Sequence, residues 1–112
     1  MKATIDELEG NVTKVVLDGR MDIDGSAAVD LRMNVVAGSS TRVLVDLAGV
    51  TFLGSMGLRS IVLPAQAVRR RGGKMALLNP IPLVEEVLKG ANIPALVPIY
   101  HDLDAALAEL RA

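Results

Sequence analysis

Two short segments of almost unbroken apolar character, residues 42–47 and 74–78, constrain the fold of this chain most strongly. Each has the length of a strand, and an apolar run without polar alternation is typical of a strand that is covered on both faces. Such strands occur mainly in parallel sheets, whose crossover connections place helices on the two faces. Segments with helical spacing follow both runs, so the sequence predicts an α/β fold.

The other strands are predicted from β-branched residues and turn signals. Thr4–Leu8 and Val12–Leu17 form an opening hairpin, and Gly19 ends the second of these strands. Ala95–Tyr100 is predicted as a last strand, which Pro98 confines to an edge of the sheet.

Helices are expected between the strands. The first is capped by Asp22 or Asp24 and turns Ala28, Leu31 and Val35 toward the core. The second ends at a basic run followed by glycines, and Pro64 is expected to kink it. Pro82 suits the first turn of the third helix, and Asp102 caps the last. The predicted order is ββαβαβαβα: a mixed, mostly parallel sheet of about four or five strands with about four helices, in one domain spanning residues 1–112.

Ser55 lies between the strand at 42–47 and the second helix, which is expected to begin near Met56. We expect Ser55 to occupy the N-cap position, where free amides and the helix dipole favour negative charge. Its hydroxyl can simply cap the helix, or it can carry a phosphate that accepts hydrogen bonds from the amides of Met56, Gly57 and Leu58. The residues alone leave both interpretations open.

The composition argues against several classes of function. Aromatic residues make up 2% of the chain and the net charge is −1, so neither a stacking platform nor a positive field for nucleic acid is expected. The basic run Arg69–Arg71 is better interpreted as a solvated helix end, and His101 as a turn residue rather than a metal ligand. No nucleophile with a base and an orienting group is visible, so we expect no catalytic residues and no enzyme. The absence of cysteine, of a leader and of a membrane span predicts a cytoplasmic protein. We expect no cofactor.

Three motifs, in register with the predicted elements, resemble those of the STAS family of bacterial anti-sigma factor antagonists. Gly19-Arg20-Met21-Asp22 is similar to the family's Gly-x-Leu-Asp turn, and Asp46-Leu47-Ala48-Gly49-Val50 to its Asp-Leu-Ser-x-Val turn. Ser55-Met56-Gly57-Leu58 is similar to its Asp-Ser-Ser-Gly-Leu motif. The resemblance runs in order from about Val12 to Leu110.

The resemblance implies a protein that switches partners. In the family, the serine matching Ser55 is phosphorylated by an anti-sigma factor that is itself a serine kinase, and a phosphatase resets the cycle. The unphosphorylated form binds that kinase and releases its sigma factor. The partner-binding residues that we expect from this match are Asp22, Asp46, Leu53, Gly54, Ser55, Met56, Gly57 and Leu58. A mean hydropathy of +0.41 also predicts an exposed apolar patch, which could serve a partner or a homodimer.

The chain departs from the family pattern beside Ser55. Gly54 stands where many members have Asp, and Met56 where a small residue is common. These differences favour an alternative, in which the protein is a STAS adaptor subunit of a transport or signalling complex that is never phosphorylated. A small enzyme is the third hypothesis.

Overall fold

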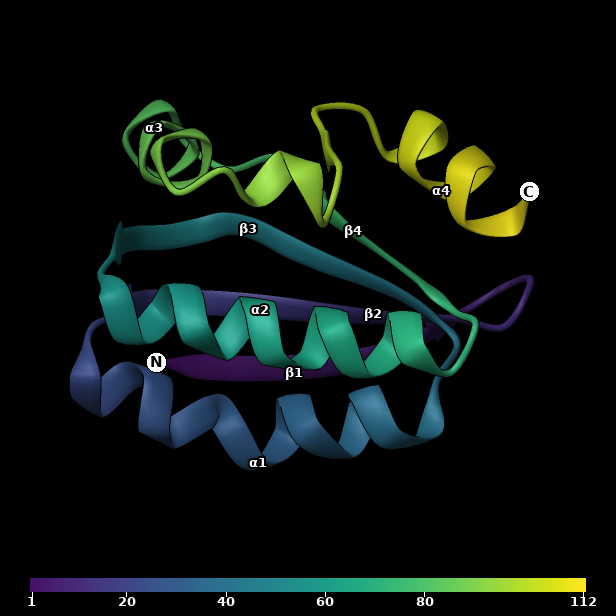
Figure 1. Ribbon diagram of the computed structural model, residues 1–112, viewed down its shortest axis with the longest axis horizontal. Coiled ribbons are helices and arrows are strands. Elements are labelled where there is room, and N and C mark those ends of the chain that lie inside the picture. Colours follow the sequence, from purple (N-terminus) through teal and green to yellow (C-terminus); the bar gives the residue numbers. More distant parts are fainter.

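The computed structural model describes all residues, 1–112, and has the predicted order of strands and helices (Figure 1). A short 3₁₀ turn, Ile93–Ala95, precedes the last strand. The elements are β1 (Lys2–Leu8), β2 (Val12–Met21), α1 (Ile23–Ser39), β3 (Arg42–Leu53), α2 (Ser55–Arg70), β4 (Lys74–Leu78), α3 (Pro82–Gly90), β5 (Ile99–Tyr100) and α4 (Leu103–Arg111).

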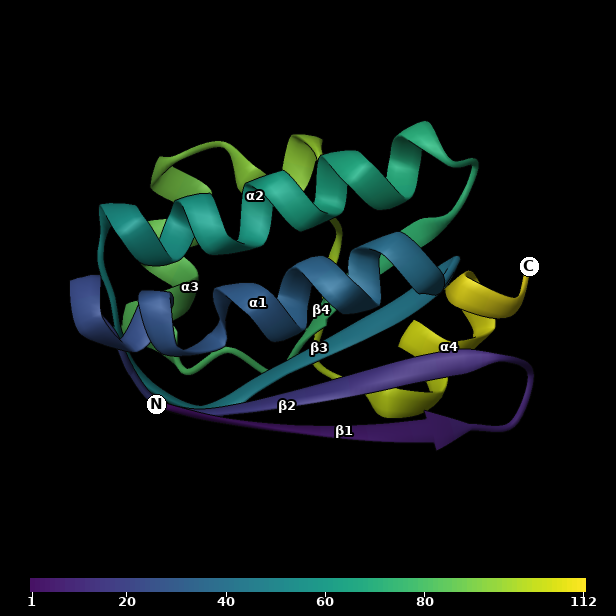
Figure 2. The ribbon, with the colours of Figure 1, turned by 90° about the horizontal axis from the view of Figure 1, so that it is seen from below.

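The five strands form one sheet in the order β1-β2-β3-β4-β5. β1 is antiparallel to β2, and the other neighbours are parallel. Helices α1 and α2 each follow a parallel strand and lie side by side along the sheet, as Figures 1 and 2 show. Both helices therefore begin at the end of the sheet where β2 and β3 finish, which is where ligands bind in many open α/β sheets.

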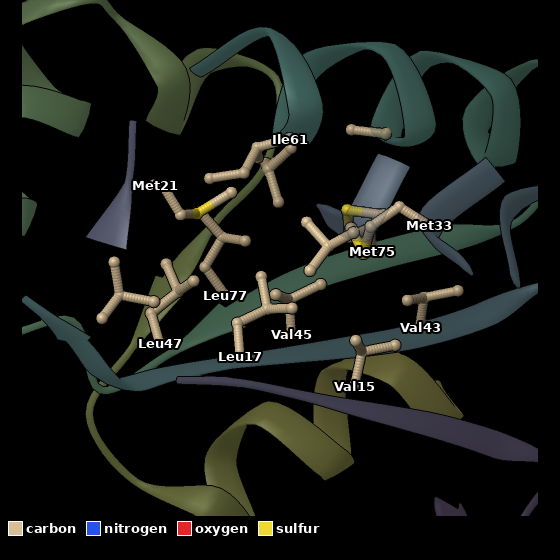
Figure 3. Close-up of a cluster of buried hydrophobic side chains, with 14 of the residues drawn as sticks. Val15, Leu17, Met21, Met33, Val43, Val45, Leu47, Ile61, Met75 and Leu77 are labelled. Carbon is tan, nitrogen blue, oxygen red and sulfur yellow. The ribbon is translucent and has the colours of Figure 1, made fainter. Parts of the chain in front are cut away.

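The sheet has an apolar core on each face. The larger core, part of which Figure 3 shows, is made almost entirely of aliphatic side chains and methionines from the strands and from α1, α2 and α3. Val43 and Val45 belong to it, whereas Leu44 belongs to the smaller core under α4. Alternate residues of β3 thus enter opposite cores, which confirms a strand covered on both faces.

Strands β2 and β3 are longer than the sequence predicts. β2 continues past Gly19 to Met21, and β3 continues past Leu47 to Leu53. The register between them shifts near Asp18 and Gly19, whose φ is +119°. The turn-like residues therefore form irregularities inside paired strands and do not end them.

The predicted buried face of the first helix was wrong. Ala28, Leu31 and Val35 are exposed, and the large apolar side chains that pack on the sheet are Val29, Met33 and Val36. Apolar residues occur on more than one side of α1, so spacing alone could not show which side faces the sheet.

The other differences lie near prolines. Helix α2 continues through the buried Pro64 to Arg70, and the structure gives no break there. The predicted strand 95–100 is reduced to Ile99–Tyr100, which pairs only with β4 at the edge of the sheet, as expected of the strand next to Pro98. None of the helices is long and apolar enough to cross a bilayer.

Candidate functional site

Ser55 is the first residue of α2, not its cap. The N-cap is Gly54, whose extended backbone (φ −100°, ψ −175°) leads from β3 into the helix, so the predicted capping role of Ser55 is wrong. No side chain caps α2. Ser55 is exposed, and its hydroxyl makes no hydrogen bond within the protein. The hydroxyl is therefore free to react or to contact a partner.

The first turn of α2 offers free amide donors beside that hydroxyl. The Leu58 amide donates to the Gly54 carbonyl at 3.0 Å, so Leu58 cannot serve an anion as the sequence suggested. The amides of Ser55, Met56 and Gly57 precede this bond and have no carbonyl acceptor within the helix. These three donors and the helix dipole make the start of α2 favourable for negative charge.

Close packing at two residues fixes the start of α2. The Gly54 amide donates to the Met21 carbonyl at 3.1 Å, which ties the helix cap to the end of β2. Gly57 is buried, and a Cβ there would lie 2.6 Å from Leu53 Cδ1 and 2.7 Å from Met21 Cβ. Leu53 is only 4% exposed. Leu53 and Gly57 are therefore buried residues that fix the position of the first turn of α2, which carries Ser55. Their side chains do not form the surface that a partner would meet.

A hollow of about 270 Å³ opens beside Ser55. Its lining consists of Asp22, Ile23, Phe52, Gly54, Ser55 and Met56, so it joins the ends of β2 and β3 to the starts of α1 and α2. The site is thus half apolar, with one carboxylate and one hydroxyl. The structure brings four of the eight predicted partner-binding residues into this lining.

Asp22 is held by two interactions. Its Oδ1 accepts a hydrogen bond from the Gly25 amide at 2.8 Å and caps α1, as predicted. Its Oδ2 lies 3.7 Å from Arg20 Nε, and the Arg20 guanidinium lies 4.4 Å from the centre of the Phe52 ring. The sequence analysis did not name Arg20, Phe52 or Ile23 as site residues. Arg20 and Phe52 meet because the register of β2 against β3 pairs them, and Ile23 reaches the hollow as the first residue of α1.

Asp46 and Leu58 do not line the hollow. Asp46 lies inside β3 opposite Val16 and Leu78, where Oδ1 accepts from the Ala48 amide at 2.9 Å and Oδ2 lies 3.8 Å from Lys14 Nζ. The segment that the sequence analysis matched to a turn, Asp46-Leu47-Ala48-Gly49-Val50, therefore lies inside β3. Leu58 is half-buried and packs against the larger core.

His101 lies far along the chain from these residues and pairs with a carboxylate. Its Nε2 lies 2.6 Å from Glu85 Oε1, which links the loop before α4 to α3. Hydrogen bonds from His101 and from Lys89 lower the pKa of the Glu85 carboxyl below its ordinary value of 4.5. No group of three or more metal-ligating side chains converges in the protein.

The STAS domain family matches residues 3–106. This chain belongs to the STAS domain family. BtrV of Bordetella bronchiseptica is 26% identical over 112 residues, covering 99% of this chain and 96% of that protein. The anti-sigma F factor antagonist of Paenibacillus polymyxa is 28% identical over 98 residues, covering 86% of this chain and 84% of that protein.

Solved structures agree with this assignment. An anti-sigma factor antagonist from Mycobacterium paratuberculosis superposes with a TM-score of 0.88 at 25% identity, covering 99% of this chain and 94% of that one. The phosphorylated form of the Bacillus cell fate determinant SpoIIAA has the same fold, with a TM-score of 0.74 at 14% identity, covering 96% and 99% of the two chains. The relatives and structures of this STAS chain thus include named anti-sigma factor antagonists.

Proposed function

We propose that this STAS protein is a cytoplasmic anti-sigma factor antagonist that is switched by phosphorylation of Ser55. It binds an anti-sigma factor that is also a serine kinase, and this binding releases the sigma factor. The kinase then phosphorylates Ser55, and a serine phosphatase restores the unmodified form. The observation that carries the proposal is the exposed Ser55 hydroxyl, which has no hydrogen-bond partner and lies beside free helix amides.

Two relatives support this proposal in different ways. The Paenibacillus polymyxa relative is named an anti-sigma F factor antagonist. The structure of phosphorylated SpoIIAA indicates that this fold accommodates the modification in at least one protein. Family membership extends both properties to this chain as a proposal.

The geometry explains how a phosphate at Ser55 would act as a switch. A phosphoserine carries about −1.5 to −2 charges, and the free amides of the first turn can accept this charge without unfolding the helix. The hollow, however, also holds the Asp22 carboxylate and the apolar side chains of Ile23 and Met56. A partner that covers this surface would have to desolvate the phosphate, and a penalty of about 3 kcal/mol would weaken binding roughly a hundredfold.

Intact-mass spectrometry tests the modification directly. The protein is incubated with ATP and the anti-sigma factor kinase encoded nearest to its gene, with Ser55→Ala and Ser39→Ala in parallel. Ser39 is exposed at the opposite end of α1 and serves as the matched control. We expect one added phosphate on wild type and on Ser39→Ala, and none on Ser55→Ala.

Binding to the same kinase separates the two main hypotheses. Tight binding without any phosphate on Ser55 would contradict the switch and favour the adaptor subunit. The departures from the family pattern at Gly54 and Met56 favour the same alternative. A phosphate that persists on Ser55→Ala would assign the modification to another residue.

A further inference from the structure

Large apolar side chains that are exposed gather on α1 and α2. Eight such side chains are exposed in the protein, and five of them belong to these two neighbouring helices: Ile23, Leu31, Val35, Met56 and Leu63. We call these five residues the α1–α2 face. The most exposed of all are Leu31 at 76% and Ile23 at 71%, and both lie on α1.

The residues of α1 form a continuous row. Ile23, Ala27, Leu31 and Val35 are all exposed and are spaced four residues apart, so they follow one side of the helix. The side chains that pack on the sheet, among them Val29, lie on another side of α1. Single exposed apolar residues are common on soluble proteins, but a row of them bordering a groove indicates an interaction site.

A groove of about 420 Å³ runs between the two helices beside this row. Met56, Arg59, Leu63 and Pro64 line it from α2, and Asp30 and Asn34 line it from α1. Ser60 closes its floor, where its hydroxyl donates to Asp30 Oδ1 at 2.5 Å. The Asp30 carboxylate is therefore engaged within the protein, whereas Arg59 makes no hydrogen bond or ion pair.

The charge of this region indicates the chemistry of its partner. Helix α2 contains no acidic residue, and its charged residues are Arg59, Arg69 and Arg70, all exposed. Only Arg59 of these three lines the groove, whereas Arg69 lines a different hollow together with Ala65 and Lys74, so a segment lying in the groove would meet the guanidinium of Arg59 on its α2 side. The complementary segment is an amphipathic helix with apolar side chains on one face and a carboxylate on the adjoining edge where it meets Arg59.

The α1–α2 face is continuous with the hollow at Ser55. Met56 lines both the hollow and the groove, and Ile23 lines the hollow and begins the apolar row. A partner that reaches Ser55 to phosphorylate it would thus border this face directly. Figures 1 and 2 show α1 and α2 running together away from that end of the sheet.

We propose that the α1–α2 face binds an acidic amphipathic helix of the same anti-sigma factor that contacts Ser55. This inference rests on the proposed function, because it takes its partner from there. The interface then has two parts: the hollow at Ser55 senses the phosphate, and the α1–α2 face supplies affinity that does not depend on it.

Single substitutions on the row test this proposal by titration calorimetry with the anti-sigma factor. Leu31→Asp is compared with Leu83→Asp, since Leu83 is 57% exposed on α3, outside this face. We expect Leu31→Asp to weaken binding at least tenfold and Leu83→Asp to change it less than twofold. Thermal unfolding of both variants checks that neither substitution disturbs the fold.

A charge reversal tests the acidic character of the partner segment. We expect Arg59→Glu to weaken binding several-fold and to reduce its salt dependence, whereas Lys2→Glu on the exposed edge of β1 should do neither. Unchanged binding of Arg59→Glu would contradict an acidic partner segment.

The outcomes distinguish this inference from the proposed function. Wild-type binding that Leu31→Asp leaves intact would overturn the α1–α2 face alone. No binding of wild type to the anti-sigma factor would overturn both proposals. A wild-type dimer in light scattering that Leu31→Asp dissociates would assign the face to a second copy of this chain and overturn the anti-sigma factor as its occupant.

Discussion

Gly57 is the residue at which the start of α2 tolerates the least change. An added Cβ would lie 2.6 Å from Leu53 Cδ1 and 2.8 Å from the Met21 carbonyl oxygen, and that oxygen belongs to the backbone and cannot turn away. We expect Gly57→Ala to lower the free energy of unfolding by about 1–3 kcal/mol, measured by urea denaturation.

Gly38 provides the matched control for this substitution. It also lies in a helix, but no atom comes within 4 Å of a Cβ built there. Gly38→Ala should raise stability by up to about 1 kcal/mol, because alanine loses less conformational freedom in a helix than glycine. Equal effects of the two substitutions would contradict the packing explanation.

Residues near Ser55 show what the sequence can predict of a site. The position of Ser55 at the start of α2 was predicted to within one residue, because strand and helix patterns meet there. Its freedom from capping was not predicted, since Gly54 and Ser55 are both acceptable caps by type. Arg20 and Phe52 could not be found from the sequence, because only the pairing of β2 with β3 brings them together.

The apolar pattern of the sequence predicts the buried side of an element correctly when the element has one apolar side, or when both of its sides are apolar. The segments of β3 and β4 that the sequence singled out are almost unbroken apolar runs, and their apolar side chains are all buried in the structure. The buried side of helix α1 could not be predicted in this way, because the helix has two apolar rows. One row includes Leu31 and is exposed, and the other packs on the sheet. The face that the sequence took for the core is the one that the structure leaves exposed.

Helix α3 and the loop before α4 are joined by an ion pair that should depend on pH. The neighbouring His101 and Lys89 lower the pKa of the Glu85 carboxyl below 4.5. A carboxyl with a lowered pKa in the folded state stabilises the protein above its ordinary pKa, and this contribution is lost as the pH falls through the folded value. We therefore expect wild type to be more stable than Glu85→Gln above pH 4.5, and the difference to shrink below pH 4.5 and to vanish once the pH is below the folded-state pKa.

Chemical denaturation at a series of pH values checks this expectation. Glu86→Gln is the control, because the adjacent Glu86 forms no ion pair. A stability difference between wild type and Glu85→Gln that grows as the solution becomes more acidic would contradict the assignment.

At the scale of the whole molecule, the fold separates the proposed switch residue, Ser55, from the core. Ser55 stands at one end of the sheet, outside both apolar cores, and its hydroxyl holds nothing together. The two crossovers that carry α1 and α2 place both helix starts at this end, so the position of the site depends on the topology, whereas the side chain of Ser55 belongs to neither core.

This separation predicts that phosphorylation changes the surface and leaves the fold intact. In amide spectra of the protein with phosphoserine at position 55, we expect shifts at the ends of β2 and β3 and in the first turns of α1 and α2. Amides at the opposite end of the sheet, such as those of Thr13 and Ser40, should not shift, because the new charge contacts only the hollow and the free amides. Thermal unfolding should change by no more than a few degrees. Chemical-shift changes throughout the core under α1 and α2, or a large loss of stability, would contradict this prediction. The phosphate would then act by unfolding the domain and not by changing the binding surface.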